Sequence, residues 1–384
     1  MLILELIILS VALFFLGFYF AYFLVCLRYS RLGIRTNLNS PSEELLPQIS
    51  FIVPVYNEIK MIESKLSNFN QIDYPNEKLE VVFVDGGSND GTIEALKNFG
   101  KNSKFALKVV EQGSRKGFNS AVIEGFHQTS GEIIFITGAE TQYASNAVKL
   151  IVRHFADPMV GAVNGTMRLS NVEAVASTKI EAAYRTLYDF IRDAESKMDA
   201  PFDIKGEIAA ARRSVCQQIV DKKEMLKKGC IDACFSFQSK VDGLRTVYEP
   251  LAVYYEPAPK SLHESFKQQI RRAATLVQNM FLFKKLILKP KYGLFGMLIM
   301  PVHFMMLIVL PYFFMFSIVG IVLLMFVNPL SIVAISLLVL GLMGIALSQG
   351  VRAFFKVQIT LIVATFRMVT GVETQKFERL LSAR

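Results

Sequence analysis

Apolar runs at both ends of this chain of 384 residues enclose a long stretch of mixed polarity. The run from Leu2 to Leu27 has Glu5 as its only charge and exceeds the roughly 20 residues that cross a bilayer. It lacks a basic leading segment, so we expect an uncleaved membrane anchor. Arg28, Arg31 and Arg35 follow at once, which predicts an amino terminus outside the cell and a cytoplasmic continuation.

The middle of the chain, to about residue 289, alternates short β-rich runs with segments of helical periodicity. The expected strands are 49–55, 79–85, 107–111, 132–137 and 161–167, and the expected helices between them are 59–69, 92–99, 119–129 and 146–155. Strands separated by helices predict an α/β domain whose mostly parallel, Rossmann-like sheet is covered on both faces.

A second apolar region follows this domain. It runs from Gly293 to Val327, interrupted by Pro301 and Pro311, and resumes from Leu330 to Leu347. We expect an interfacial segment up to about residue 300 and then a membrane hairpin.

The last part of the chain is both apolar and basic. Phe354 to Val369 is long enough for a further crossing, but the embedded Lys356 and Arg367 favour an amphipathic helix at the membrane interface. The basic residues here predict a cytoplasmic carboxyl terminus, and they are Arg352, Lys356, Arg367, Lys376, Arg379 and Arg384. The predicted parts are a membrane helix at 1–27, a linker at 28–48, the α/β domain at 49–261, amphipathic interfacial helices at 262–300, the membrane hairpin at 301–348 and an interfacial or cytoplasmic segment at 349–384.

Composition agrees with a membrane-anchored protein. Hydrophobic residues make up 52% and charged residues 20%, which excludes a disordered chain and argues against a wholly soluble one. The net charge of +9 fits either a surface that faces phosphates or the positive-inside pattern. The four cysteines form neither a disulfide framework nor a zinc motif, so we expect a reducing compartment.

Polar and glycine-rich segments follow the first two expected strands. The first strand ends in Val53-Pro54-Val55-Tyr56-Asn57-Glu58 and the second in Val84-Asp85-Gly86-Gly87-Ser88-Asn89-Asp90-Gly91-Thr92. In open parallel sheets, ligands bind beyond the carboxyl ends of the strands, so these segments predict a site. The alternative for the first segment is an ordinary helix cap at Asn57. Neither segment has the spacing of a dinucleotide-binding fingerprint or of a P-loop.

Three further segments are informative when taken together with these two. The first runs from Arg115-Lys116-Gly117 to Gly131-Glu132, the second from Gly206 to Arg213, and the third from Tyr248 to Glu256. Together, the five segments resemble the family 2 inverting glycosyltransferases of GT-A fold. The resemblance is to the dolichyl-phosphate mannose synthase and polysaccharide synthase branches, and it covers roughly residues 49 to 285.

The resemblance implies inverting transfer of a sugar from a UDP- or GDP-sugar to a membrane-associated lipid or glycan acceptor. Inversion needs a base that deprotonates the acceptor. The family places this aspartate about eleven residues before the glycine that precedes the closing strands, and the count back from Gly243 leads to Asp232. Its Cys, Ile, Ala and Phe neighbours predict partial burial and a raised pKa. The alternative is a carboxylate on a helix surface.

The resemblance also implies a set of donor-binding residues, namely Pro54, Tyr56, Glu58, Asp85, Gly87, Arg115, Lys116, Ala139, Gln269 and Arg272. Gln269-Ile270-Arg271-Arg272-Ala273 matches the Gln-x-x-Arg-Trp motif of the family, with Ala273 in place of Trp. The motif lies on an expected amphipathic helix. We expect Arg272 to hold the diphosphate by bidentate contact, and Arg271 or Lys284 to face lipid headgroups.

The metal motif of the family is altered. The expected Asp-x-Asp is Gly138-Ala139-Glu140, which leaves Glu140 as the candidate ligand for Mn²⁺ or Mg²⁺. Donor phosphates supply further oxygen ligands, so one carboxylate can suffice. The alternatives are metal-independent transfer that depends on Arg115, Lys116 and Arg272, or a degenerate enzyme.

The favoured hypothesis is therefore a multi-pass cell-membrane glycosyltransferase, with a cytoplasmic active site, acting in cell-envelope glycan synthesis. A processive exopolysaccharide synthase is the alternative enzyme, and a catalytically silent nucleotide-sugar-binding subunit is the alternative of another class. No nucleic-acid-binding module is recognised, so nucleic acid is not an expected partner. The sugar, the nucleotide, the acceptor and the oligomeric state stay open.

Overall fold

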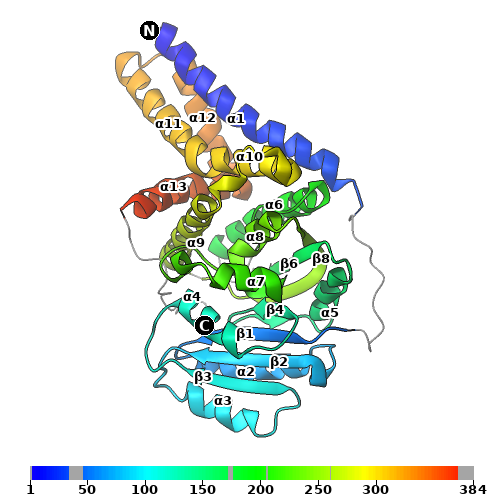
Figure 1. The fold of residues 1–384 in the computed structure, drawn as a ribbon. Helices are drawn as coiled ribbons and strands as arrows, with labels where there is room; N and C mark the ends of the chain where they lie inside the picture. The colour runs from blue at the N-terminus through cyan, green and yellow to red at the C-terminus, as the bar shows by residue number, and fades with distance from the viewer. Residues whose placement is uncertain (1, 34–45, 172–175, 205, 260, 371–384) are drawn as a thin grey trace.

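The computed structural model describes residues 2–33, 46–171, 176–204, 206–259 and 261–370 (Figure 1). Most of the expected linker at 28–48, with Arg35, lies outside the described residues. So do Lys376, Arg379 and Arg384 of the predicted carboxyl-terminal segment.

Among the described residues, one eight-stranded sheet forms the centre of the domain, in the order β3-β2-β1-β4-β7-β6-β8-β5. The strands are β1 Ile49–Val55, β2 Leu79–Asp85, β3 Ala106–Glu111, β4 Ile133–Ile136, β5 Gln142–Tyr143, β6 Val160–Leu169, β7 Ala209–Arg212 and β8 Arg245–Glu256. β1 pairs in parallel with β2 and β4, so that Ile49 lies opposite Leu79 and Ile133. β7 runs antiparallel to β4 and β6, so the sheet is parallel in its first half and mixed in its second.

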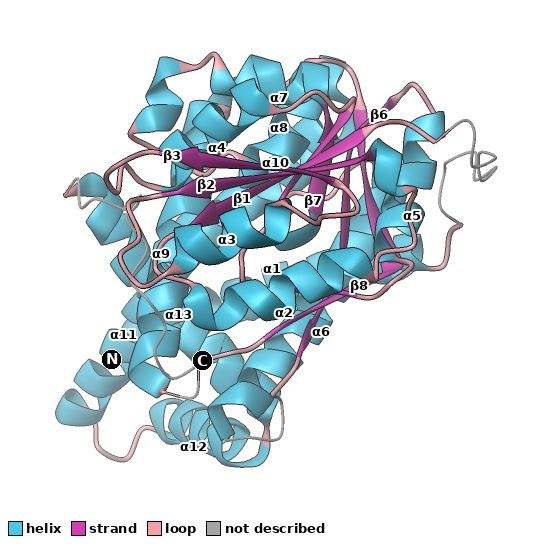
Figure 2. Ribbon diagram, turned by 90° about the horizontal axis from the view of Figure 1, so that it is seen from below, coloured by secondary structure: helices cyan, strands magenta, loops and turns pink. Residues whose placement is uncertain are grey.

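Helices cover both faces of this sheet (Figure 2). They are α2 Ile59–Asn70, α3 Thr92–Gly100, α4 Phe118–Gln128, α5 Ala147–Val152, α6 Ala176–Met198, α7 Arg213–Val220, α8 Phe235–Val241 and α9 Leu262–Leu282. On one face, Phe51 stacks on Phe135 with ring centroids 4.6 Å apart, beneath α2, α3 and α5. On the other, Ile52 and Val84 pack against α4, α7 and α8. Successive strand residues point to opposite faces, so the continuous apolar runs fill both cores.

Two helices are long and apolar enough to span a membrane in the part of the chain that the structure describes. They are Ile3–Ser30, within α1 (Leu2–Ser30), and Phe295–Val327. A third span would require α12 (Ile332–Leu347) and α13 (Gln349–Val369) to act as one broken pair, since they are bent by 112°.

The helix that ends at Val327 is continuous from Phe295, whereas the sequence predicted an interfacial segment up to about residue 300. Its parts are a π-helical turn at Phe295–Ile299, α10 at Met300–Phe304, a second π-helical turn at Met305–Val309 and α11 at Leu310–Val327. Each π-helical turn comes shortly before Pro301 or Pro311. A proline lacks the N–H and clashes with the carbonyl one turn back, and the wider turn accommodates both effects without breaking the helix.

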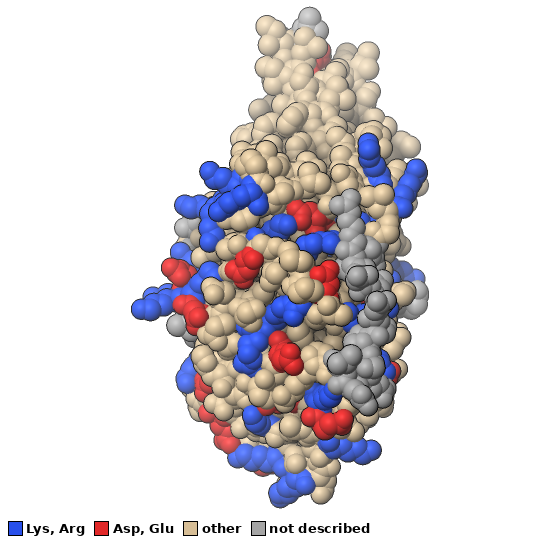
Figure 3. All heavy atoms as spheres, turned by 45° about the vertical axis from the view of Figure 1, so that its right-hand side comes forward, with Lys and Arg blue, Asp and Glu red and all other residues tan. Residues whose placement is uncertain are grey.

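α13 lies across α9 at the base of the membrane helices (Figure 1), and Ile270 and Ala274 of α9 pack against Ala364. Figure 3 shows that the end of the molecule formed by α1, α11 and α12 carries few charged side chains, and that Lys and Arg gather below it. This position of α13 is the one that an interfacial helix would occupy.

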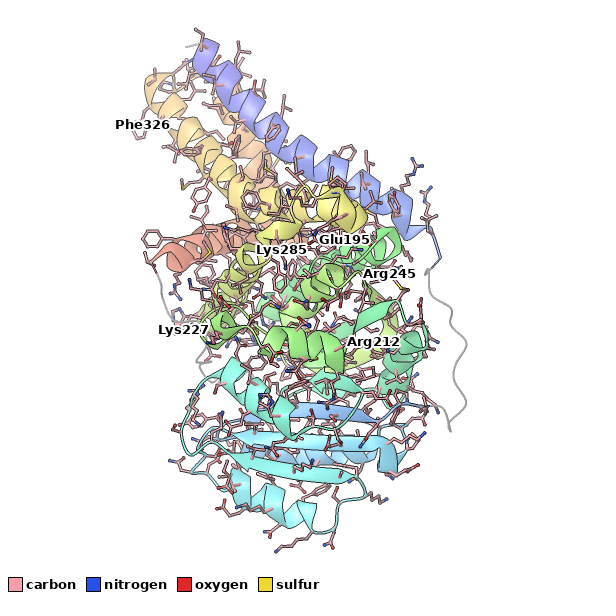
Figure 4. All side chains as sticks on the ribbon, in the orientation of Figure 1. Glu195, Arg212, Lys227, Arg245, Lys285 and Phe326 are labelled. Carbon is pink, nitrogen blue, oxygen red and sulfur yellow. The ribbon has the colours of Figure 1, made fainter. Side chains whose placement is uncertain are left out.

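A buried polar cluster joins the membrane helices to the domain, with Glu195 of α6 at its centre (Figure 4). Glu195 Oε1 accepts a hydrogen bond from Tyr22 of α1 at 2.5 Å and contacts His303 Nε2 of α10 at 2.6 Å. Its other oxygen accepts from the Phe202 backbone N–H at 2.8 Å, and the Phe202 ring stacks on His303. A buried carboxylate with all these partners fixes the membrane helices on α6.

Candidate active site

A cavity of about 250 Å³ lies at the carboxyl ends of β1, β2 and β4, beneath α9; we call it the strand-end cavity. Eight of the predicted site residues line it, namely Pro54, Tyr56, Glu58, Arg115, Lys116, Glu140, Asp232 and Arg272. The topology explains this convergence, because parallel strands bring their carboxyl ends to one edge of the sheet.

Asp85 and Gly87 do not line the strand-end cavity but form the turn beside it. Asp85 is fully buried, and its Oδ2 accepts hydrogen bonds at 2.8 Å from the backbone N–H groups of Gly87 and Ser88. Gly87 has a φ of +85°, and a Cβ there would lie 3.1 Å from the Gly113 carbonyl oxygen. The two residues therefore shape the loop against the segment that carries Arg115.

Ala139 and Gln269 also lie outside the strand-end cavity. Ala139 is 2% exposed and belongs to the hydrophobic core. Gln269 donates from Nε2 to Glu181 Oε2 at 2.6 Å, on the other side of α9. The helical period accounts for this, because the face of α9 that carries Arg272 toward the cavity also carries Gln268, four residues earlier.

Tyr56 and Arg115 meet at the rim of the strand-end cavity. The Arg115 guanidinium lies over the Tyr56 ring, 4.5 Å from its centroid. Asn57, beside Tyr56, does not cap α2; its Oδ1 accepts from the Asn89 N–H at 2.8 Å and ties the ends of β1 and β2 together. An aromatic ring stacked on a cation offers a flat surface to a nucleoside base.

Arg272 bridges two carboxylates that the sequence did not single out. One Nη of Arg272 lies 3.0 Å from Glu207 Oε1 and 3.1 Å from Glu256 Oε1. Burial, and then the nearby Glu207 charge, raise the pKa of Glu256, the last residue of β8. Although burial opposes it, Glu256 and Glu207 raise the pKa of Arg272 above its ordinary value. The position of Glu256 at the end of a strand was the signal available for it in the sequence.

Arg271 faces the strand-end cavity, where the sequence predicted a contact with lipid headgroups. Burial, and then the charge of Arg272, lower its pKa to about 10. Two adjacent guanidinium groups so placed would each gain stability from an anionic ligand.

Asp232 begins a short 3-10 turn at Asp232–Cys234 and lines the same cavity. It is 9% exposed, and its Oδ1 is buried without a hydrogen-bond partner. Burial raises the pKa of Asp232 to about 6, with a smaller contribution from the charge of Glu207. A buried carboxylate with a free oxygen and a pKa near the working pH has the properties of a general base.

Gly138 and Glu140 act as a pair. A Cβ at Gly138 would lie 2.8 Å from Glu140 Oε2, so the glutamate side chain folds back over the glycine. The longer side chain thus places its carboxylate over the residue that replaces the first Asp of the Asp-x-Asp motif.

Lys65 supports the Glu140 loop from below and was not predicted. It is fully buried and donates from Nζ to Thr137 Oγ1 at 3.1 Å and to the Thr141 carbonyl at 2.7 Å. Burial lowers its pKa to about 7, against the opposing charge of Glu140. A lysine on a helix gives no sequence signal for such a role, because only the fold brings α2 beneath this loop.

The family model described as glycosyl transferase family 2 matches residues 50–220, so the chain carries a glycosyltransferase family 2 domain. A solved structure of the mannosyltransferase PcManGT from Pyrobaculum calidifontis, in complex with GDP-Man and Mn²⁺, matches 96% of this chain and 100% of its own, with a TM-score of 0.82 and 28% identity. The predicted family and GT-A fold are confirmed.

Two curated relatives are poly-β-1,6-N-acetyl-D-glucosamine synthases. The protein of Staphylococcus aureus is 28% identical over 248 residues, which cover 62% of this chain and 58% of that protein. The protein of Staphylococcus epidermidis is 25% identical over 241 residues, covering 62% and 57%. The chain therefore matches somewhat more than half the length of these relatives.

Proposed function

We propose that the protein is a membrane-anchored inverting glycosyltransferase that moves a sugar from a nucleoside diphosphate sugar to a membrane-associated acceptor. The observation that carries this proposal is the strand-end cavity, which is lined both by a candidate proton acceptor, Asp232, and by two guanidinium groups, Arg271 and Arg272. The two kinds of group match the two charges of the reaction, a proton released by the acceptor and a negative charge on the leaving diphosphate.

The reaction follows from this arrangement. Asp232 accepts the proton of the acceptor hydroxyl as its oxygen bonds to the anomeric carbon of the donor sugar. The bond from that carbon to the diphosphate breaks, and the diphosphate leaves with the electron pair. Arg272 and Arg271 stabilise its charge without reorganisation, because the carboxylates of Glu207 and Glu256 already hold Arg272 in place.

The nucleoside would lie at the rim of the strand-end cavity, between Tyr56 with Arg115 and the turn shaped by Asp85. Both GDP- and UDP-sugars fit this description. The mannosyltransferase that matches 96% of this chain is in complex with GDP-Man, which favours a GDP-sugar as the first donor to test.

A divalent cation fits the site only together with the donor. Among the described residues, no three His, Cys, Asp or Glu side chains are grouped so as to hold a metal. The carboxylate of Glu140, in the space that Gly138 leaves, would supply one hard oxygen ligand to Mn²⁺ or Mg²⁺, and donor phosphates would supply others. When bound, the cation would neutralise charge on the diphosphate.

We expect Glu140→Gln to weaken nucleotide-dependent Mn²⁺ binding at least about tenfold, because an amide is a much poorer ligand for a hard cation. Paramagnetic resonance of Mn²⁺ titrated with protein, with and without GDP, measures this apart from turnover. The exposed Glu94→Gln on α3 is the matched control. Equal wild-type rates in Mn²⁺ and in EDTA would instead favour the metal-independent alternative.

The dependence of kcat/KM on pH reports the ionisation of the proposed general base. Since Asp232 must be ionised to accept a proton, kcat/KM is expected to fall about tenfold per pH unit below pH 6 and to level off above it. The dissociation constant of GDP, measured over the same range, separates this loss from changes in Glu256. A profile that stays flat down to pH 4.5 would contradict the assignment.

We also propose that the amino terminus is outside and that the domain and carboxyl terminus are cytoplasmic. Arg28 and Arg31 follow the apolar run that ends at Leu27, and the turn at Asn328, after α11, would then lie outside. A membrane-impermeant maleimide applied to intact cells is expected to label Asn328→Cys and not Asp221→Cys, an exposed position of the domain. The reverse pattern would invert the topology.

A processive synthase is a second candidate, because the staphylococcal relatives are named as poly-β-1,6-N-acetyl-D-glucosamine synthases. Against it, Ala273 stands where the motif of the family has Trp. A catalytically silent subunit has less support, since Glu140 folded over Gly138 retains a carboxylate at the altered metal motif.

A further inference from the structure

A second cavity, of about 170 Å³, lies between α6, α9 and α13; we call it the helix-lined cavity. Arg272 and Thr275 of α9 line both cavities, as do Glu207 and Asp232. The two cavities therefore meet at Asp232, and the helix-lined cavity extends from there toward the membrane helices.

One face of α6 forms a wall of the helix-lined cavity. Glu181, Arg185, Tyr188 and Arg192 follow each other at intervals of three or four residues, and all four line it. This spacing places them on one side of a helix. Glu195, three residues beyond Arg192, continues the stripe and anchors α6 to α1 and α10.

The walls of the helix-lined cavity carry polar atoms that no protein group satisfies. Arg185 Nε, Gln269 Oε1 and Asp232 Oδ1 are buried and have no hydrogen-bond partner. Arg185 as a whole is 5% exposed. A buried polar atom without a partner is costly, so these atoms indicate a ligand that both donates and accepts hydrogen bonds. Hydroxyl groups do both.

Carboxylates balance the positive charges of the residues that line this cavity. Each of its arginines is paired with a carboxylate that also lines it: Arg185 with Glu181 at 2.9 Å, Arg192 with Asp203 at 2.8 Å and Arg272 with Glu207 at 3.0 Å. Asp232 adds a further carboxylate. A phosphate in this cavity would lose its hydration and meet only arginines that already pair with carboxylates, whereas the strand-end cavity is also lined by Arg115, Lys116 and Arg271.

The end of the cavity away from the sheet is mostly apolar, with Thr360 of α13 as a polar residue among aliphatic ones. Leu276 of α9, Leu307 of the apolar helix that ends at Val327, and Val357 and Leu361 of α13 line it. Polar atoms at one end and aliphatic side chains beside the membrane helices at the other match a molecule with a hydroxyl-bearing head and a hydrocarbon tail.

From these observations we propose that the helix-lined cavity binds the acceptor, and that the acceptor is an uncharged hydroxyl group carried on a lipid, such as the sugar of a glycolipid, and not a lipid phosphate. This inference rests on the proposed function. It names the substrate class that reaches Asp232 from the membrane side, while the donor occupies the strand-end cavity.

The bonding changes are those of glycoside formation. The lipid-borne hydroxyl oxygen forms the bond to the anomeric carbon and gives its proton to Asp232, and the nucleoside diphosphate leaves. Arg185 Nε donates to, and Gln269 Oε1 accepts from, neighbouring hydroxyls of the same head, which orients the reacting one.

Purified full-length protein in phosphatidylcholine nanodiscs tests this with radiolabelled donor and three acceptors: decyl glucoside, methyl glucoside and farnesyl phosphate. We expect transfer to decyl glucoside and none to farnesyl phosphate. Methyl glucoside should have a kcat/KM at least about 100-fold lower, because it lacks the tail that Leu276 and Leu307 would bury.

The substitution Glu181→Gln is expected to let the helix-lined cavity bind a lipid phosphate. It removes the carboxylate paired with Arg185 and makes the charge of the cavity more positive by one unit. Farnesyl phosphate is then expected to inhibit transfer to decyl glucoside at least about ten times more strongly than in the wild type. Glu224→Gln, an exposed position, is the control and should leave the inhibition unchanged.

The outcomes separate the two proposals. Transfer to farnesyl phosphate in preference to decyl glucoside, or equal use of both, overturns the acceptor assignment and leaves the glycosyltransferase proposal standing. Nucleotide binding without transfer to any of the three acceptors, or to a total lipid extract, overturns the proposed function itself.

Discussion

Replacing Asp232 by Asn is expected to lower kcat for sugar transfer by about 10²–10⁴-fold, the usual contribution of a general base. The amide keeps the shape of the side chain but cannot accept the proton. Donor binding should change little, because Arg271, Arg272 and the rim residues contact the nucleotide in our account. Single-turnover transfer and the dissociation constant of GDP measure the two effects separately.

Stability distinguishes a catalytic Asp232 from a structural one. Burial raises the pKa of this carboxyl to about 6. Above that pH the side chain is ionised, and its buried charge lowers the stability of the folded protein. We therefore expect Asp232→Asn to leave the thermal midpoint at pH 8 equal or higher while activity is lost. Asp221→Asn, at an exposed position, is the control. A lower midpoint with activity lost in proportion would assign Asp232 to the fold.

Arg272→Ala is expected to reduce kcat/KM for the donor by about 10²–10³-fold, because it removes a preorganised positive charge from the leaving diphosphate. It also leaves Glu207 and Glu256 close to each other without their shared cation. Arg272→Lys keeps the positive charge but lacks the planar guanidinium group, which can contact two phosphate oxygens at once. We therefore expect a smaller loss of kcat/KM that is still at least about tenfold. Steady-state kinetics with GDP-Man and Mn²⁺ measure both.

A second substitution separates the role of Arg272 in the reaction from its ion pairs. In Glu207→Gln, Arg272 keeps Glu256 but loses one partner, which should affect donor turnover less than Arg272→Ala does. If Arg272→Ala lowered the thermal midpoint while kcat/KM stayed within about threefold of the wild type, Arg272 would be a structural residue and the diphosphate site would lie elsewhere.

The strands were predictable because burial on both faces leaves an unmistakable pattern. Ile49–Val55 and Leu79–Asp85 are continuous apolar runs bounded by turn residues, and both have the predicted bounds. The antiparallel β7 was not predictable from such a pattern, because Ala209–Arg212 is short and its direction depends on pairing with β4 and β6. The continuity of the helix through Pro301 was not predictable either, since a π-helical turn accommodates the proline, and the interfacial segment up to about residue 300 stays a prediction.

The sequence predicted those site residues that come directly after the end of a strand. Tyr56 and Glu58 come directly after β1 and line the strand-end cavity. Arg271 required knowledge of which face of α9 turns inward, and Glu207 required the position of the 3-10 turn Gly206–Ile208. Lys65 required the packing of α2 under the Glu140 loop. The motif alone suggested Gln269 as a donor contact, but the helical period turns it toward α6 instead.

The most direct test of the central claim is the release of nucleoside diphosphate together with transfer of labelled sugar to lipid, by the purified chain in nanodiscs that contain a total membrane lipid extract. GDP-Man and UDP-GlcNAc are tested in parallel with Mn²⁺, and Asp232→Asn serves as the inactive reference. We predict one sugar transferred per diphosphate released with at least one donor, and a product of discrete size. Binding of both donors without release, in the wild type as in Asp232→Asn, would contradict the account.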